Sequence, residues 1–209
     1  MNSKTYFDDV SNNWDTMRQA FFSESIREKM CENAQVKPGE TAADIGAGTG
    51  FVTQELIGRG LHVLAVDQSQ DMLDVLKQKF GSTGQITCIQ GDAYTLPIDD
   101  KSVTYVMANM FLHHVENPEQ AILEMVRLLK PDGKLIIADL DHHTHEFLRT
   151  EQYDVWLGFD RADISEWLTN AKLSNVRVDS LDEECCCDSC VSCDSAAISI
   201  FIASAEKPL

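Results

Sequence analysis

Two acids and three alternating glycines form the segment of this chain with the clearest potential for chemistry. The run TAADIGAGTG places Asp44 at the end of a short apolar stretch, followed by Gly46, Gly48 and Gly50. Glycines lack the Cβ atom that keeps a ligand away from the backbone, and they adopt dihedral angles that other residues avoid. A second apolar run, LHVLAVD, ends in Asp67, where an acid can bind ribose hydroxyls in dinucleotide-binding folds. These residues predict a site for a cofactor that carries adenosine.

The spacing of the glycines narrows the choice of cofactor. The dinucleotide fingerprint G-x-G-x-x-G requires a third glycine where this chain has Phe51. The phosphate loop G-x-x-x-x-G-K-[ST] is absent, so no nucleoside triphosphate site is visible. A helix that begins near Phe51 would point free N–H groups at a ligand in the turn.

An acid directly before the glycines, as in DIGAGTG, resembles the S-adenosylmethionine motif of class I methyltransferases. The resemblance extends to the type 11, ubiquinone-biosynthesis-like branch through four further segments: YFDDVSNNWD (6–15), DQSQDML (67–73), GDAYTLPIDDKSVTYV (91–106) and HHVENPEQAILEMVRLLKPDGKLIIADL (113–140). It implies an S-adenosylmethionine cofactor and an enzyme that transfers methyl groups. It also implies an α/β fold, with a Rossmann-like, doubly wound, mostly parallel seven-stranded sheet and an antiparallel C-terminal strand.

The same resemblance assigns roles to individual cofactor residues. Asp44 orients the glycine turn, Asp67 binds the ribose diol, and Asn109 lies near the methionine moiety. Gln68 and Met72 flank the adenine, and Asp92 and Ala93 meet its edge. Asp67 could instead cap the helix that follows it, and Met72 could equally belong to the core.

A cysteine cluster lies close to the C-terminus, at Cys185, Cys186, Cys187, Cys190 and Cys193. If the sixth strand is parallel to the others, the cluster lies near the transferable methyl group. Thiolates prefer soft metals and metalloids, so the leading prediction is catalytic: the five cysteines hold a metalloid substrate such as arsenite, whose lone pair attacks the methyl group. A structural metal site on the same five thiolates is an equal alternative. A disulfide is disfavoured in a reducing compartment.

Arsenite methyltransferases are class I enzymes with widely spaced cysteines, and this chain departs from that pattern. A second function therefore stays open, in which the acceptor is a small organic molecule, quinone-like or another metabolite, and the cysteines form a structural metal site. A third is a non-enzymatic metal or redox sensor built on the methyltransferase fold.

Two groups of histidines follow predicted strands on the ligand side of the sheet. His113 and His114 form one group, and His142, His143 and His145 form the other, accompanied by Asp139 and Asp141. Histidine and carboxylate together can act as a general base or bind a metal. The His-His pair is typical of type 11 methyltransferases with differing substrates, which favours an architectural role there.

Regular elements that position these residues follow from hydrophobic periodicity. Strands are predicted at 41–45, 62–66, 86–90, 103–108, 134–139, 176–181 and 197–204. Helices are predicted at 11–32, 51–59, 70–80, 118–129 and 163–171. Strands that alternate with helices indicate a parallel sheet, whose ligands collect at the carboxyl ends of its strands.

Length and charge limit the remaining possibilities. With 209 residues the chain is expected to be one methyltransferase domain, with a helical lid (1–35), a cofactor-binding core (36–145) and a C-terminal half (146–209) that carries a cysteine-rich hairpin loop (185–193). The net charge of −17 disfavours nucleic-acid and anionic-membrane partners and leaves a small-molecule substrate. No run reaches a membrane span and no leader is visible, so a cytoplasmic location is expected. The oligomeric state is not readable.

Overall fold

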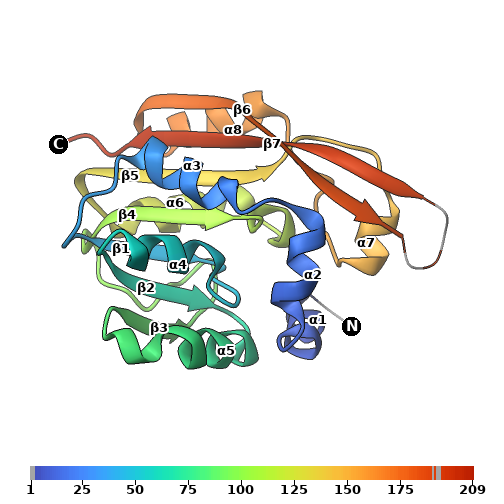
Figure 1. Ribbon diagram of the computed structural model, residues 1–209. Helices are drawn as coiled ribbons and strands as arrows, with labels where there is room; N and C mark the ends of the chain where they lie inside the picture. Colours follow the sequence, from blue (N-terminus) through green and yellow to red (C-terminus); the bar gives the residue numbers. More distant parts are fainter. Residues whose placement is uncertain (1–2, 190, 192–193) are drawn as a thin grey trace.

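The structure is a computed structural model that describes residues 3–189, 191 and 194–209. These residues form a seven-stranded sheet with the order β3-β2-β1-β4-β5-β7-β6 (Figure 1). The strands are β1 (Thr41–Ile45), β2 (His62–Asp67), β3 (Ile86–Gln90), β4 (Val103–Asn109), β5 (Leu129–Leu140), β6 (Ser174–Asp188) and β7 (Ser195–Glu206). Strands β1 to β5 are parallel, and β7 is antiparallel to both β5 and β6. The predicted Rossmann-like sheet with an antiparallel C-terminal strand is confirmed.

Helices cover both faces of the sheet, which explains why its central strands are almost continuously apolar. Helices α3, α4 and α5 lie on one face, and α6 and α8 lie on the other (Figure 1). Their bounds are α3 (Ser25–Ala34), α4 (Phe51–Gly58), α5 (Gln70–Phe80), α6 (Pro118–Leu128) and α8 (Arg161–Asn170). Helix α5 begins where the Ser69 hydroxyl accepts a hydrogen bond from the Met72 N–H, at 3.1 Å. Its buried stripe, Met72, Leu73 and Leu76, faces the sheet.

The N-terminal region differs from the single helix predicted over residues 11–32, which was wrong. It folds as α1 (Ser3–Val10), α2 (Trp14–Phe21) and α3. A turn at residues 11–13 separates α1 from α2. Between α2 and α3, Phe22 has an extended backbone, with φ −152° and ψ 160°. Ser and Asn at the first break favour turns over helix because their side chains compete for backbone hydrogen bonds. The breaks let α3 pack on the sheet while α1 and α2 lie over the strand ends.

The hairpin of β6 and β7 extends past the edge of the sheet toward α7 (Phe147–Glu151) (Figure 1). Register shifts in β6 between Ser174 and Arg177 and between Ser180 and Glu184 bend this strand. The prediction that strand 176–181 is followed by a loop at 185–193 was wrong in part, because β6 continues to Asp188. Cys185 to Cys187 therefore lie on a strand, paired with Ile198 to Ala196 of β7. Cys190 and Cys193 lie outside the described residues.

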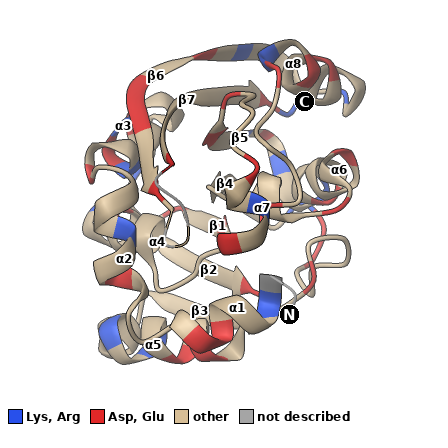
Figure 2. Cartoon of the chain, turned by 90° about the vertical axis from the view of Figure 1, so that its right-hand side faces the viewer, with Lys and Arg blue, Asp and Glu red and all other residues tan. Residues whose placement is uncertain are grey.

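The carboxyl ends of the parallel strands form one rim, framed by α1, α2 and α7 (Figure 2). Acidic residues at this rim come from several separate elements, including α1 and β6 (Figure 2). In the part of the chain that the structure describes, no helix has the length and apolar character needed to cross a membrane.

Candidate active site

The glycine turn after β1 has the backbone geometry that its sequence predicts. Gly46 has φ +71° and Gly48 has φ +52°, both in the left-handed region that favours glycine. A Cβ on Gly46 would lie 2.4 Å from the Phe111 ring, so only glycine fits there. A Cβ on Gly48 would meet only Trp14 Nε1, at an ordinary contact distance of 3.8 Å, and Gly48 lines the cavity described next. The turn therefore leaves its backbone accessible to a ligand.

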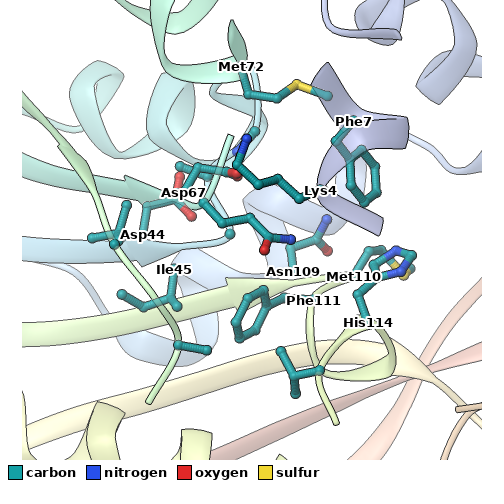
Figure 3. A pocket seen from close by; sticks show the side chains of 18 of the residues that line it. Lys4, Phe7, Asp44, Ile45, Asp67, Met72, Asn109, Met110, Phe111 and His114 are labelled. Carbon is teal, nitrogen blue, oxygen red and sulfur yellow. The ribbon is translucent and has the colours of Figure 1, made fainter. Parts of the chain in front are cut away.

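A cavity of about 580 Å³ lies over this turn (Figure 3). All the predicted cofactor residues except Gly50 line it, namely Asp44, Gly46, Gly48, Asp67, Gln68, Met72, Asp92, Ala93 and Asn109. Gly50 instead begins α4 and packs against α5, where a Cβ would lie 2.8 Å from the Phe80 ring. Lys4 and Phe7 of α1 close the cavity from the opposite side (Figure 3). The structure brings these residues together, and their individual contacts with a cofactor stay predictions.

The two acids of the cavity are held by short hydrogen bonds. Asp44 Oδ2 accepts from the Thr53 hydroxyl at 2.6 Å, and burial raises the pKa of Asp44 to about 6. Asp67 accepts the Gly48 N–H on Oδ2 at 2.8 Å and the Ser69 N–H on Oδ1 at 2.9 Å. Burial also raises the pKa of Asp67, against these N–H donors. A cation in the cavity would favour the ionised form of both acids.

Besides His114, two polar side chains at the cavity have buried atoms without a partner among the described residues. One is Asn109, whose Oδ1 accepts no hydrogen bond. The other is Arg18 of α2, whose Nε and Nη1 donate none. The Arg18 guanidinium lies over the Phe51 ring, 4.2 Å from its centroid. An amide oxygen and a guanidinium with free donors suit the ammonium and carboxylate of an amino-acid moiety such as that of S-adenosylmethionine.

Arg18 was missed by sequence reasoning, which placed it in the middle of one long helix. A usable signal was present, because an arginine on the same helical face as Trp14 and Phe22 is unusual for a purely apolar stripe.

A second cavity of about 50 Å³ adjoins the first and is lined in part by the end of β6. It shares five lining residues with the large cavity: Phe7, Trp14, Phe22, Met110 and His114. The remaining walls include His113, Asp154, Cys185 and Cys187. The histidine pair after β4 and two of the clustered cysteines therefore line the same small cavity, next to the large one.

His113 is fixed by Asp139 at the end of β5. Its Nδ1 lies 2.5 Å from Asp139 Oδ1, and Asp139 is completely buried. Asp139 also accepts N–H bonds from Leu112 and Leu140, each at 2.8 Å. Although burial opposes the charge, Asp139 and Asp154 raise the pKa of His113 to about 9. This network supports the architectural role for His113.

Asp154 joins this group from the loop after α7, and no sequence signal marked it. Its Oδ1 lies 3.9 Å from His113 Nε2 and 3.8 Å from His114 Nδ1. Burial raises the pKa of Asp154 to about 6. Burial and the neighbouring His113 charge lower the pKa of His114 well below its usual value. His114 Nδ1 is buried and has no hydrogen-bond partner among the described residues.

The cysteines of β6 alternate across the strand. Cys185 and Cys187 are each 6% exposed and their sulfur atoms lie 3.7 Å apart, while Cys186 is exposed. The contact with Cys187, together with burial, raises the pKa of the Cys185 thiol, and the contact with Cys185 lowers the pKa of Cys187. The pair therefore favours one protonated and one more acidic thiol.

The second group of histidines is placed apart from this centre. His143 Nδ1 accepts the His145 N–H at 3.2 Å, and burial lowers the pKa of His143 to about 4. His142 is exposed. Asp141 pairs with Arg161, with Oδ2 and Nη2 2.6 Å apart. None of these residues lines either cavity.

Comparison with known proteins gives consistent matches. Residues 43–137 match the family described as methyltransferase domain. A demethylmenaquinone methyltransferase of Renibacterium salmoninarum is 34% identical over 147 residues, 69% of this chain and 61% of that protein. The ubiquinone/menaquinone biosynthesis C-methyltransferase UbiE of Shewanella pealeana is 31% identical over 131 residues, 60% of this chain and 52% of that protein. The chain thus spans about half of the length of these curated relatives.

Among solved structures, a chain of the complex between the Haloferax volcanii Trm112 methyltransferase activator and a methyltransferase superposes with a TM-score of 0.79. The match covers 100% of this chain and 98% of that chain, at 20% sequence identity. At this identity, the likeness shows the shared fold.

Proposed function

Because this chain contains a methyltransferase domain of the class I, S-adenosylmethionine-dependent kind, we propose that it transfers the methyl group of that cofactor to a small acceptor at the inner end of the large cavity. The observation that carries the proposal is that the small cavity adjoins the large one, with five lining residues in common. A cofactor over the glycine turn would direct its methionine end toward this junction. An acceptor there would be enclosed by the helices of the predicted lid.

The transfer itself requires an electron pair of the acceptor and an in-line approach. That pair attacks the methyl carbon as the bond from carbon to sulfur breaks. The bonding electrons return to sulfur, which leaves neutral S-adenosylhomocysteine. Any proton that the acceptor loses leaves to water. The protein contributes mainly position, since holding the two atoms about 3–3.5 Å apart replaces much of the entropic barrier.

A small aromatic acceptor of the quinol type is the first candidate. The wall between the cavities is formed largely by aromatic side chains, with Phe7, Trp14 and Phe22 among the shared residues. The rings of Phe7 and Trp14 meet edge to face, 5.3 Å apart. Such surfaces stack against flat rings and exclude water. The similarity to demethylmenaquinone methyltransferases supports the same class of acceptor.

A metalloid such as arsenite is the second candidate, favoured by the cysteine pair. Two buried sulfur atoms 3.7 Å apart line the small cavity, which has room for little more than one heavy atom and its substituents. Thiolates are the preferred ligands of soft metalloids. In this case the acceptor pair is the lone pair of the trivalent metalloid, and the methyl transfer oxidises that atom.

One assay separates the two candidates. Fully reduced protein is given S-adenosylmethionine with either a ring-unmethylated naphthohydroquinone or arsenite, and S-adenosylhomocysteine is measured by mass spectrometry. The quinol proposal predicts product with the hydroquinone in the wild type and in a variant carrying Cys185→Ser and Cys187→Ser. Product that requires arsenite and disappears in that variant would establish the metalloid instead. Bound cofactor without product on any acceptor in these two classes would contradict both.

A further inference from the structure

We propose that His113, His114 and Asp154 form a binding site for one zinc ion at the junction of the two cavities. This site goes beyond the transfer of methyl groups, and it is independent of which acceptor is used. It also differs from the predicted metal site, which consisted of cysteines alone.

The positions of the donor atoms suit a small divalent ion. His113 Nε2, His114 Nδ1 and a carboxylate oxygen of Asp154 all lie within 4.8 Å of one another. The two distances to Asp154 Oδ1 are 3.9 and 3.8 Å. Tetrahedral zinc with bonds of about 2.0–2.1 Å holds its ligand atoms about 3.4 Å apart. The two imidazole–carboxylate distances therefore have to shorten by roughly half an ångström, and the two imidazole nitrogens, which lie within 4.8 Å of each other, have to approach by side-chain rotation.

The ligands are oriented before any ion binds. Asp139 holds the Nδ1 side of His113, which directs Nε2 toward Asp154. A carboxylate behind a ligating histidine is the usual support of a zinc ligand, because it fixes the ring and raises its basicity. Asp139 is fixed in turn by backbone N–H donors at Leu112 and Leu140.

The loop that carries Asp154 is tied to the histidine pair. The N–H groups of Val155 and Trp156 both donate to the His113 carbonyl, at 2.9 and 3.0 Å. The Trp156 indole N–H donates to the Val115 carbonyl at 2.9 Å. The main-chain hydrogen bonds of Val155 and Trp156 and the indole hydrogen bond of Trp156 thus hold Asp154 opposite the imidazoles. The buried His114 Nδ1 has no hydrogen-bond partner among the described residues, and an ion held between it and Asp154 would satisfy it.

Zinc is the ion that the surroundings favour. Two imidazoles and one carboxylate are common zinc ligands, and a thiolate is a further one. Cys187 lines the same small cavity, and its thiol is the more acidic of the Cys185–Cys187 pair. Cys187 is therefore our candidate for a fourth ligand, and the acceptor is the alternative. Calcium and magnesium prefer sites made only of oxygen atoms, so they do not fit.

The test measures metal binding in reduced, chelator-treated protein and does not depend on turnover. Three of the clustered cysteines are first replaced in a Cys186→Ser, Cys190→Ser, Cys193→Ser background, which removes the competing site of five thiolates. Zn²⁺ affinity is measured by competition with a chromophoric chelator, and Co²⁺ serves as a spectroscopic probe. We expect one ion per chain and the intense visible absorption of tetrahedral Co²⁺.

Asp154→Asn and His114→Gln are then compared in this background. Each should weaken Zn²⁺ binding by more than about tenfold and remove the Co²⁺ spectrum, because each deletes a ligand. His62→Gln is the matched control, because His62 is an exposed histidine at the amino end of β2. The His62→Gln protein should bind Zn²⁺ with the same affinity as the background protein. Circular dichroism identifies any variant that fails to fold, and the other variant then decides. Affinities within about twofold of the background in both ligand variants would overturn the proposal, as would the absence of binding in the background.

Discussion

Arg18→Met is the substitution that tests the cofactor cavity most specifically. The Arg18 side chain is only 6% exposed, and its Nη2 pairs with Glu24 Oε1 at 2.6 Å. Its Nε and Nη1 have no partner among the described residues, although the side chain lines the cavity. We expect these donors to bind the carboxylate of S-adenosylmethionine, and methionine keeps the apolar stem without the charge.

Hydrogen bonds to charged groups contribute about 1.5–3 kcal/mol each, so losing even one should raise the cofactor Kd by roughly 10- to 150-fold. Stability should change much less. Glu24 is 47% exposed, so that ion pair contributes little, and the contact with Phe51 adds about 1 kcal/mol. Large loss of affinity with nearly unchanged stability is the expected signature.

Calorimetric titration with S-adenosylmethionine and thermal unfolding without ligand measure these two effects. Arg27→Met is a matched control, because Arg27 pairs with the same Glu24 and lies over the same Phe51 ring, 5.3 Å from its centroid. Arg27 does not line the cavity, so its substitution should leave the Kd unchanged. A Kd in Arg18→Met equal to that of wild type, or an equal loss in both variants, would refute the assignment.

Three further predictions concern buried groups. Burial raises the pKa of Asp44 to about 6, and the cationic cofactor favours the ionised form of this acid. The Kd of the cofactor should therefore rise by up to about tenfold per pH unit below pH 6, and Asp44→Asn should flatten this part of the pH profile. Parallel pH profiles of wild type and variant in calorimetry would contradict the prediction. Asp139→Asn breaks the buried pair with His113 and should lower the free energy of unfolding in urea by about 3–5 kcal/mol, and a loss below about 1 kcal/mol would count against the network. Phe201→Ala empties a fully buried position and should cost about 3–5 kcal/mol in the same measurement, unlike a surface truncation.

The glycine turn and the acids beside it could be predicted from the sequence because they depend on local backbone preferences and on strand order. Asp44 and the three alternating glycines after it lie in one short segment, whose turn geometry follows from the backbone preferences of glycine. Strands β1 and β2 are parallel neighbours, so Asp67 at the end of β2 lies beside the glycine turn that follows β1. Of the predicted cofactor residues, only Gly50 does not line the cavity, because it packs against α5.

Long-range contacts explain what sequence reasoning missed. Asp154 follows a short helix that has no clear periodicity, and its partners lie on another strand end. Arg18 was covered only by the helix predicted over residues 11–32, and the breaks between α1, α2 and α3 place it at the cavity. Likewise, the continuation of β6 beyond residue 181 was not predicted, because the acids between Ser180 and Cys185 interrupt the alternation of apolar residues that indicates a strand. Charged residues of this kind are common on exposed edge strands.

Binding of S-adenosylmethionine to the glycine turn is best measured by calorimetric titration of the wild type and of Gly48→Val. A valine at φ +52° is strained, and its side chain would project into the cavity. Gly58→Ala is the control, because a Cβ there meets no atom within 4 Å. We predict one cofactor per chain in the wild type and the control, and no detectable binding in Gly48→Val. Unaltered binding in Gly48→Val, or no binding in the wild type, would contradict the assignment of this cavity.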